Sequence, residues 1–332
     1  MSAAPADRAN RAPDAAGPRR SAPHAVPQVA VVTAAYNVER YIGATIASVL
    51  KQTLEDFEMI VVDDGSRDAT AQIVAAVDDP RVRLISTENR GVGAARNRGL
   101  AACRAPLVVF LDGDDLLLPD ALEHMVATMA AHPDHVACFG HHVKIDEDGA
   151  PLGSDVPTRP LPASDTLRHL LRRNVIVNGG ALCIRTEAAR RVGGYDPRLR
   201  FAEDLEFWCR LAALGDFVAM PERVVLQYRL RRAGANWRLA GTPFRPNLEA
   251  LEAIFAAPAL RERFTARELR RYRRLAEINT HWLAARNALS ERRLGRFAQY
   301  LLAGALRYPD SMLQWRLIWL FFRNLPLSRQ RG

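Results

Sequence analysis

Short apolar runs alternate with amphipathic segments through the first 131 residues, and this alternation constrains the fold more than any other feature of the chain. The runs are rich in β-branched residues and are predicted as buried strands, at 29–35, 57–62, 82–86 and 107–111. Segments with apolar residues at helical spacing follow each run and are predicted as helices, at 41–52, 69–77, 91–103 and 119–131. Alternating strands and helices predict an α/β fold with a doubly wound, largely parallel sheet.

The remainder of the chain divides into three regions. Residues 1–27 are rich in Ala, Pro and Arg, without an apolar run of signal-peptide length, and are predicted to be a disordered leader. Residues 28–240 form the predicted α/β domain; its later part adds predicted strands at 136–145, 181–185 and 224–230, a loop at 151–162 and a helix at 205–214. Residues 245–332 are Arg-, Leu- and Ala-rich and are predicted to be a basic helical extension.

Positive charge is concentrated in this extension. The chain carries a formal charge of +9, of which residues 245–332 contribute +10 and residues 28–244 contribute −3. A basic body would favour nucleic acid, so this distribution argues against a nucleic-acid partner. A basic tail instead indicates an anionic membrane surface or another acidic partner.

The segment 312–327 is apolar and aromatic, with arginines at 316 and 323, and is too interrupted to span a bilayer. It fits an interfacial helix, which would place the protein in the cytoplasm as a peripheral protein on the inner face of the cell membrane. A helix packed in the core or in a dimer is the alternative. The four cysteines lack metal-binding spacing and are expected to be buried free thiols.

An acidic cluster follows the strand at 107–111. Asp112, Asp114 and Asp115 carry carboxylates at i, i+2 and i+3, which would repel one another if they were isolated. A hard divalent cation relieves this repulsion, and Mg²⁺ or Mn²⁺ bound there would bridge carboxylates to substrate phosphates. A plain surface turn is the alternative, because Asp and Gly favour turns. The position at a strand's carboxyl end, where ligands bind in doubly wound sheets, favours the metal site.

Two further segments have the composition of ligand-binding loops. Asp64 lies just after the strand at 57–62, where a carboxylate can accept hydrogen bonds from a base or a ribose. Gly91 and Gly93 precede and open an Ala-rich helix, where the backbone can approach an anion. Taken alone, this glycine loop is a weak signal. Ser66 and Asp68 can also be helix N-caps.

Taken in order, these segments resemble the family 2 glycosyltransferases of the GT-A fold. The resemblance rests on four motifs, Ala35-Tyr36-Asn37, Val62 to Asp68, Gly91 to Gly99, and Phe110 to Asp115, and it covers residues 28–235. It implies a Rossmann-like, doubly wound mixed sheet and an inverting, nucleotide-sugar-dependent enzyme. By resemblance, the donor-binding residues would be Ala34, Tyr36 and Asp64 near the base, Arg96 near the sugar diphosphate, and Asp112 and Asp114 near the ribose and the metal.

The resemblance also assigns the metal ligands and the base. Asp114 and Asp115 are expected to bind the metal before Asp112. Asp204 matches the family's catalytic base, with Glu203 as the fallback. The residues themselves leave an alternative open, because either carboxylate could cap the helix that follows.

The chain departs from the family pattern at two places. Ala34 stands where the family often has Pro. In the family's Tyr-Arg-x-His-x-x-Ser segment, Arg231 stands at the His position and Gly234 at the Ser position. Three arginines of this segment could neutralise a departing diphosphate, namely Arg229, Arg231 and Arg232. A solvated basic loop is the alternative.

The resemblance therefore predicts transfer of a sugar from a nucleotide-sugar, most commonly a UDP-sugar in the family, to a carbohydrate or lipid-linked acceptor. Synthesis of a bacterial cell-surface polysaccharide or glycolipid is the expected setting. A non-catalytic nucleotide-sugar-binding module and a nucleotidyltransferase are the alternatives. A nucleotidyltransferase usually has a basic, Gly-rich loop in its first strand–helix turn, and residues 34–37 are Ala-Ala-Tyr-Asn.

Overall fold

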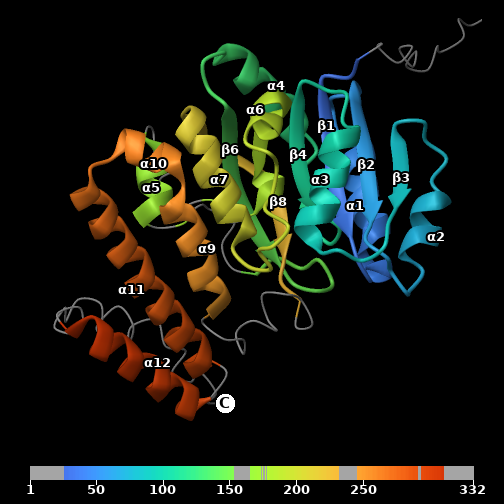
Figure 1. The fold of residues 1–332 in the computed structure, drawn as a ribbon. Helices are drawn as coiled ribbons and strands as arrows, with labels where there is room; N and C mark the ends of the chain where they lie inside the picture. The colour runs from blue at the N-terminus through green and yellow to red at the C-terminus, as the bar shows by residue number, and fades with distance from the viewer. Residues whose placement is uncertain are drawn as a thin grey trace, which may run out of the picture.

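A single eight-stranded mixed sheet forms the centre of the molecule in the computed structural model (Figure 1). The structure describes residues 26–152, 165–231 apart from 173, 175 and 177, 245–290 and 293–309. The strands lie in the order β3-β2-β1-β4-β7-β6-β8-β5. Their bounds are β1 Val29–Ala35, β2 Phe57–Asp63, β3 Val82–Ser86, β4 Leu107–Asp112, β5 Leu116–Leu117, β6 Ala137–Ile145, β7 Leu182–Arg185 and β8 Phe217–Arg229.

Strand direction and register determine where the site can lie. Strands β1 to β4 are parallel, β7 is antiparallel to both of its neighbours, and β5 is antiparallel to β8. Ala34 of β1 lies opposite Val62 of β2 and Asp112 of β4. The carboxyl ends of these three strands are therefore level, and the loops that follow them share one edge of the sheet.

Helices cover both faces of the sheet. The helices of the α/β part are α1 Glu39–Leu50, α2 Thr70–Ala75, α3 Val92–Ala102, α4 Ala121–Ala131, α5 Thr166–Arg172, α6 Thr186–Arg191 and α7 Glu203–Leu214, with a 3-10 turn η1 at Gly179–Ala181. Alternate β1 residues face opposite sides, as the pleat of a strand requires: Val31 packs with α1 and α4, and Val32 packs with α3 and α7. This two-sided packing confirms the predicted α/β class.

The basic C-terminal region packs onto the sheet domain through α7 and α5. Its helices are α9 Arg245–Ala256, α10 Pro258–Arg263, α11 Ala266–Ser290 and α12 Leu294–Arg307 (Figure 1). Leu251 and Phe255 of α9 and Tyr272 of α11 join the same apolar core as Trp208 of α7. The division predicted between 240 and 245, residues 1–25 of the predicted leader and the tail segment 312–327 lie outside the described residues. Among the described helices, none has the length and apolarity needed to cross a membrane.

The structure corrects two element boundaries and confirms the free thiols. Strand β8 begins at Phe217 rather than at 224; Pro221 and its charged neighbours obscure the first half of the strand in the sequence. That half is accommodated by register shifts against β6, where the Nε2 atom of His141 and the Pro221 carbonyl are 2.8 Å apart in a hydrogen bond. Helix α7 begins at Glu203 rather than at 205. All four cysteines are buried and free, as expected.

Candidate active site

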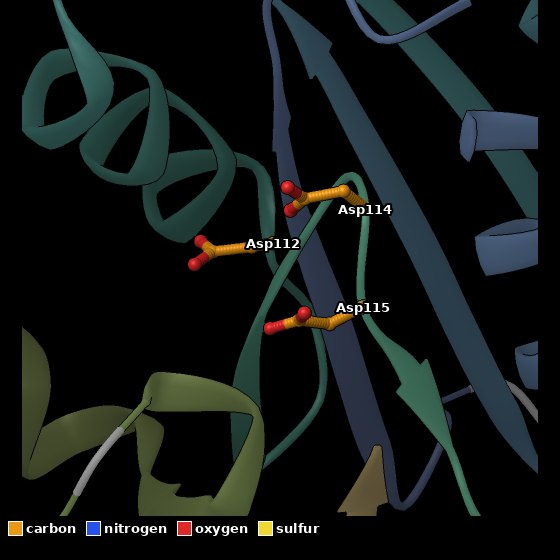
Figure 2. Close-up of side chains that lie close together, drawn as sticks. All are labelled: Asp112, Asp114 and Asp115. Atoms are coloured by element: carbon orange, nitrogen blue, oxygen red, sulfur yellow. The ribbon is translucent and has the colours of Figure 1, made fainter. Parts of the chain in front are cut away.

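Three carboxylates meet at the carboxyl end of β4. Asp112 ends that strand, and Asp114 and Asp115 lie in the turn before β5; one oxygen from each falls within 4.8 Å of the others (Figure 2). Gly113 allows the turn to lie against β1, because a Cβ there would be 3.2 Å from the Ala34 carbonyl oxygen. The cluster predicted from the sequence therefore exists as a compact group.

The three carboxylates differ in how far they are exposed. The side chain of Asp112 is 30% exposed and that of Asp114 is 14% exposed, whereas Asp115 is completely buried. Burial raises the pKa of Asp114 to about 6, with Asp112 adding to the rise and Arg231 opposing it. Burial also holds the pKa of Asp115 well above its ordinary value, and the charges of Asp114 and Asp112 raise it further. Ionising all three together is costly without nearby positive charge.

Asn178 holds two of these carboxylates together. Its Nδ2 donates to Asp112 Oδ2 at 2.9 Å and to Asp115 Oδ2 at 2.8 Å. The other oxygen of Asp115 accepts from the backbone N–H of Arg229 at 2.8 Å, so both oxygens of Asp115 are engaged by the protein. Asn178 is oriented in turn by the Gly180 N–H, which donates to its Oδ1 at 2.7 Å.

The contact of Asn178 with the acidic cluster was not predicted from the sequence. One local signal was available in the Gly179-Gly180 pair that follows it. A Cβ on Gly179 would be 2.8 Å from the Phe110 carbonyl oxygen, and a Cβ on Gly180 would be 2.9 Å from Leu111. The two glycines therefore let this segment lie directly against β4.

Arg96 connects the acidic cluster to the start of α7. Its guanidinium donates to Asp112 Oδ1 through Nη2 at 2.7 Å and to Asp204 Oδ1 through Nη1 at 2.8 Å, and Nη1 also reaches Glu203 Oε1 at 3.3 Å. The side chain is only 3% exposed, and its guanidinium carbon lies 5.0 Å from the centre of the Tyr195 ring. Nearby carboxylates, Asp204 first, keep the pKa of Arg96 well above its ordinary value despite burial. Residues 108 positions apart thus share one site.

Glu203 and Asp204 are the first two residues of α7, and they do not serve as its cap. The N-cap residue is Ala202, which has the left-handed φ of +50° and no side-chain capping bond. The carboxylates turn instead toward Arg96. Burial raises the pKa of Asp204 to about 7, Arg96 opposes this rise, and Glu203 and Asp112 add to it. The Asp204 side chain is 25% exposed, so a substrate hydroxyl could reach it.

The residues predicted near the base of the donor lie at the adjoining strand ends. Tyr36 follows β1 and is 45% exposed, which leaves its ring open to stack on a planar ligand. The oxygens of Asp64 accept from the backbone N–H groups of Arg90 at 2.9 Å and Gly91 at 2.8 Å. In the described structure Asp64 therefore fixes the glycine loop. Gly91 has a φ of +94°, a conformation that side chains disfavour.

Two arginines from the end of β8 close the cluster on its other side. Arg229 Nε donates to the Asp114 carbonyl at 2.7 Å, and Arg231 forms an ion pair with the Asp114 carboxylate. Both guanidinium carbons lie over the Tyr41 ring, at 5.1 Å and 5.4 Å from its centre. Arg232, a predicted donor-binding residue, lies outside the described residues.

The donor set fits a hard divalent cation. Carboxylate oxygens are the ligands that Mg²⁺ and Mn²⁺ prefer, and converging buried carboxylates gain most from a cation. The side chains of Asp112 and Asp114 are partly exposed, whereas Asp115 is buried. Protein groups engage all three carboxylates: Arg96 and Asn178 donate to Asp112, Arg231 pairs with Asp114, and Asn178 and Arg229 donate to Asp115. The three carboxylates lie close enough together for one oxygen of each to bind the same ion.

Comparison with known proteins places the chain in a family. Residues 30–193 match the model of glycosyl transferase family 2. The chain is 31% identical over 207 residues to a putative teichuronic acid biosynthesis glycosyltransferase, TuaG, of Bacillus subtilis, covering 61% of this chain and 79% of TuaG. The chain belongs to glycosyltransferase family 2.

Other relatives match over different spans. The putative glycosyltransferase EpsH of Bacillus subtilis is 37% identical over 132 residues, which is 39% of this chain and 38% of EpsH, so the match spans well under half of that relative. The crystal structure of S. aureus TarS residues 1–349 in complex with UDP-GlcNAc superposes with a TM-score of 0.58 at 18% identity, over 83% of this chain and 80% of that one. This similarity confirms the predicted GT-A fold.

Proposed function

We propose that this family 2 member transfers a sugar from a UDP-sugar to an acceptor hydroxyl, with inversion at the anomeric carbon. One observation carries the proposal: the Arg96 guanidinium joins Asp112 of the acidic cluster to Asp204 at the start of α7. A carboxylate that could bind the cation needed by a diphosphate and a carboxylate suited to take a proton are thereby held in one site.

On the donor side, the exposed ring of Tyr36 would stack on the base, beside the loop that Asp64 anchors. Ala34, at the level of Asp112, would line the same pocket. Asp112, Asp114 and Asp115 would together hold Mg²⁺ or Mn²⁺. When bound, the cation supplies positive charge to the diphosphate leaving group. Arg229 would add positive charge beside the cluster, and Arg232, which lies outside the described residues, is proposed for the same role from the sequence alone.

On the acceptor side, Asp204 is the proposed base and Glu203 the fallback. Its Oδ1 is held by Arg96 at 2.8 Å, which fixes the orientation of the carboxylate. Asp204 would take the proton of the acceptor hydroxyl as that oxygen forms a bond to the anomeric carbon. The bond from that carbon to the diphosphate oxygen breaks, and the nucleoside diphosphate leaves with the bonding electrons. A base with a pKa of about 7 suits this role near neutral pH.

The names of related proteins support the choice of substrates. TarS has been crystallised with UDP and with UDP-GlcNAc, which favours a UDP-sugar as the donor here. TuaG is named for teichuronic acid biosynthesis, which favours a carbohydrate or lipid-linked acceptor in bacterial cell-surface polysaccharide or glycolipid synthesis.

The alternatives fit the site less well. A non-catalytic nucleotide-sugar-binding module has no use for a buried carboxylate whose pKa lies near 7 and whose orientation is fixed by Arg96. A nucleotidyltransferase would require a basic, Gly-rich loop after the first strand, and the turn after β1 is Tyr36-Asn37.

The proposal is tested by a screen of nucleotide-sugars. Each donor is added with Mn²⁺, and thermal stabilisation and release of nucleoside diphosphate are both measured. We expect one group of UDP-sugars to raise the melting temperature and to be hydrolysed slowly in a metal-dependent way. If no nucleotide-sugar does either, the proposed function is wrong.

We further propose a peripheral position on a membrane. The predicted tail helix lies outside the described residues, but α12 carries exposed leucines, Leu294, Leu302 and Leu306, on a helix with basic residues at Arg296 and Arg307. This composition suits the surface of an anionic bilayer. The full chain should float with vesicles of anionic lipid and not with neutral vesicles, and L302D/L306D should float less. Equal flotation of the variant would exclude α12 as the contact.

A further inference from the structure

The Arg231 guanidinium is paired with the carboxylate of Asp114, on the atoms that the proposed cation would need. Its Nε and Asp114 Oδ2 form an ion pair, and both side chains are largely buried. An arginine stays protonated over the whole pH range in which proteins are folded. Arg231 is therefore a permanent cation at this oxygen and competes with any metal ion for it.

The other arginines of the site are attached differently. Arg96 is held by three carboxylates at once, on Asp112, Glu203 and Asp204. Arg229 donates to backbone carbonyls, those of Asp114, Asp146 and Glu147. The ion pairs of the described residues give Arg231 one carboxylate partner, Asp114. Release of the Arg231 guanidinium would break one ion pair, whereas release of Arg96 would break three.

The Tyr41 ring supports Arg231 in this position. The guanidinium carbon lies 5.4 Å from the ring centre, close enough for a cation–π interaction. Arg229 shares the ring at 5.1 Å and stays bonded to the backbone of the turn. Because the aromatic contact is with the face of a ring, the Arg231 side chain can change its torsion angles and keep the guanidinium in contact with Tyr41.

We propose that Arg231 is an internal counter-ion that occupies Asp114 in the donor-free enzyme and excludes the divalent cation until a nucleotide-sugar arrives. The diphosphate then provides a second partner for the guanidinium, and Asp114 becomes available to the metal. The inference rests on the proposed function. It makes metal binding depend on donor binding, so the site does not hold a metal ion permanently.

The test is a titration of the full-length protein with Mn²⁺ in the absence of nucleotide. Electron paramagnetic resonance measures the concentration of free Mn²⁺ at each step and so gives the affinity. We expect R231Q to bind Mn²⁺ at least about tenfold more tightly than the wild type, since a competing cation has been removed. R231K keeps a positive charge and should stay near the wild type. R40Q is the matched control: Arg40 pairs with Glu147 and Asp148 rather than with the cluster, and its loss should leave Mn²⁺ affinity unchanged.

Two further variants make the result decisive. R231Q/D114N should lose the tight Mn²⁺ site, which would show that the ion binds at Asp114. R231A should behave as R231Q does. The proposal is overturned if R231Q and R231A bind Mn²⁺ no more tightly than the wild type. It is also overturned if neither variant folds, because an exchangeable counter-ion is not required for folding.

The proposed function is tested separately. Thermal stabilisation by UDP-sugars with Mn²⁺ reports donor binding in the wild type and does not depend on the nucleotide-free affinity for Mn²⁺. If the wild type binds a donor but R231Q binds Mn²⁺ with unchanged affinity, the counter-ion role of Arg231 is refuted. The proposed function would not be affected by that result.

Discussion

Replacing Arg96 by methionine should destabilise the protein more than any other single loss of a charge in the site. Arg96 is 3% exposed and pairs with Asp112, Glu203 and Asp204. Methionine keeps much of the side-chain volume and leaves the three carboxylates without their shared cation. Breaking a buried ion pair from one side costs about 3–5 kcal/mol in the free energy of unfolding. We expect R96M to lose about that much, measured by urea denaturation at pH 8.

The pH dependence of this loss identifies its cause. Burial raises the pKa of Asp204 and Arg96 opposes the rise, which leaves this pKa at about 7. Without Arg96 the folded-state pKa rises further above the unfolded value. A carboxyl whose pKa is raised by folding costs stability above that pKa, and the cost disappears as the pH falls toward the unfolded value. The difference between R96M and the wild type should therefore shrink between pH 8 and pH 5.

The matched control is R83M. Arg83 is half exposed and lies 4.0 Å from Glu58, a buried carboxylate that keeps Arg104 and the Ala105 N–H as partners. Loss of Arg83 should therefore cost only about 0–1 kcal/mol. The reasoning is refuted if R96M loses less than about 1 kcal/mol more than R83M, or if its loss is the same at both pH values.

Three further outcomes follow from the same geometry. The acid limb of the pH profile of donor turnover should rise through about pH 7, because a base at Asp204 would act only when ionised and the pKa of Asp204 lies at about 7; a flat profile from pH 5.5 to 8.5 would exclude Asp204 as the base. N178A should lower the free energy of unfolding by about 1–3 kcal/mol and should also reduce turnover, because it removes the donor shared by Asp112 and Asp115; urea denaturation and activity check both, and an unchanged variant would contradict the role. A202G should raise stability by about 1 kcal/mol, seen as a higher melting temperature, because Ala202 has a φ of +50°; a lower melting temperature would count against strain there.

The first half of the fold was predictable because its signals are local. The strands β1 and β3 were predicted with the bounds they have, since β-branched runs and helical spacing are read within a few residues. The acidic cluster was predictable for the same reason, as its members follow one strand directly. The start of strand β8 was predicted several residues too far along the chain, because Pro221 and its charged neighbours interrupt the apolar pattern there. In the structure this first half of β8 still pairs with β6.

The assembly of the site was less predictable, because it depends on contacts between distant segments. The sequence shows only that Arg96 lies in an Ala-rich helix. Its three carboxylate partners, which connect α3 to α7, are seen only in the folded chain. The pairing of Arg231 with Asp114 was not predictable either. The sequence shows an arginine where the family often has histidine, but it does not show which carboxylate pairs with it. The contacts of Asn178 with Asp112 and Asp115 were not predictable either, because they join segments that lie far apart in the chain.

D204N tests most directly whether Asp204 is the catalytic base in the same site as the acidic cluster that is proposed to bind the donor. The measurement is release of nucleoside diphosphate from the best UDP-sugar at pH 8, alongside thermal stabilisation by the same donor with Mn²⁺. We expect turnover to fall by about 10²- to 10⁴-fold while donor stabilisation remains within the range of the wild type. Loss of donor binding together with turnover, or turnover close to that of the wild type, would contradict the account.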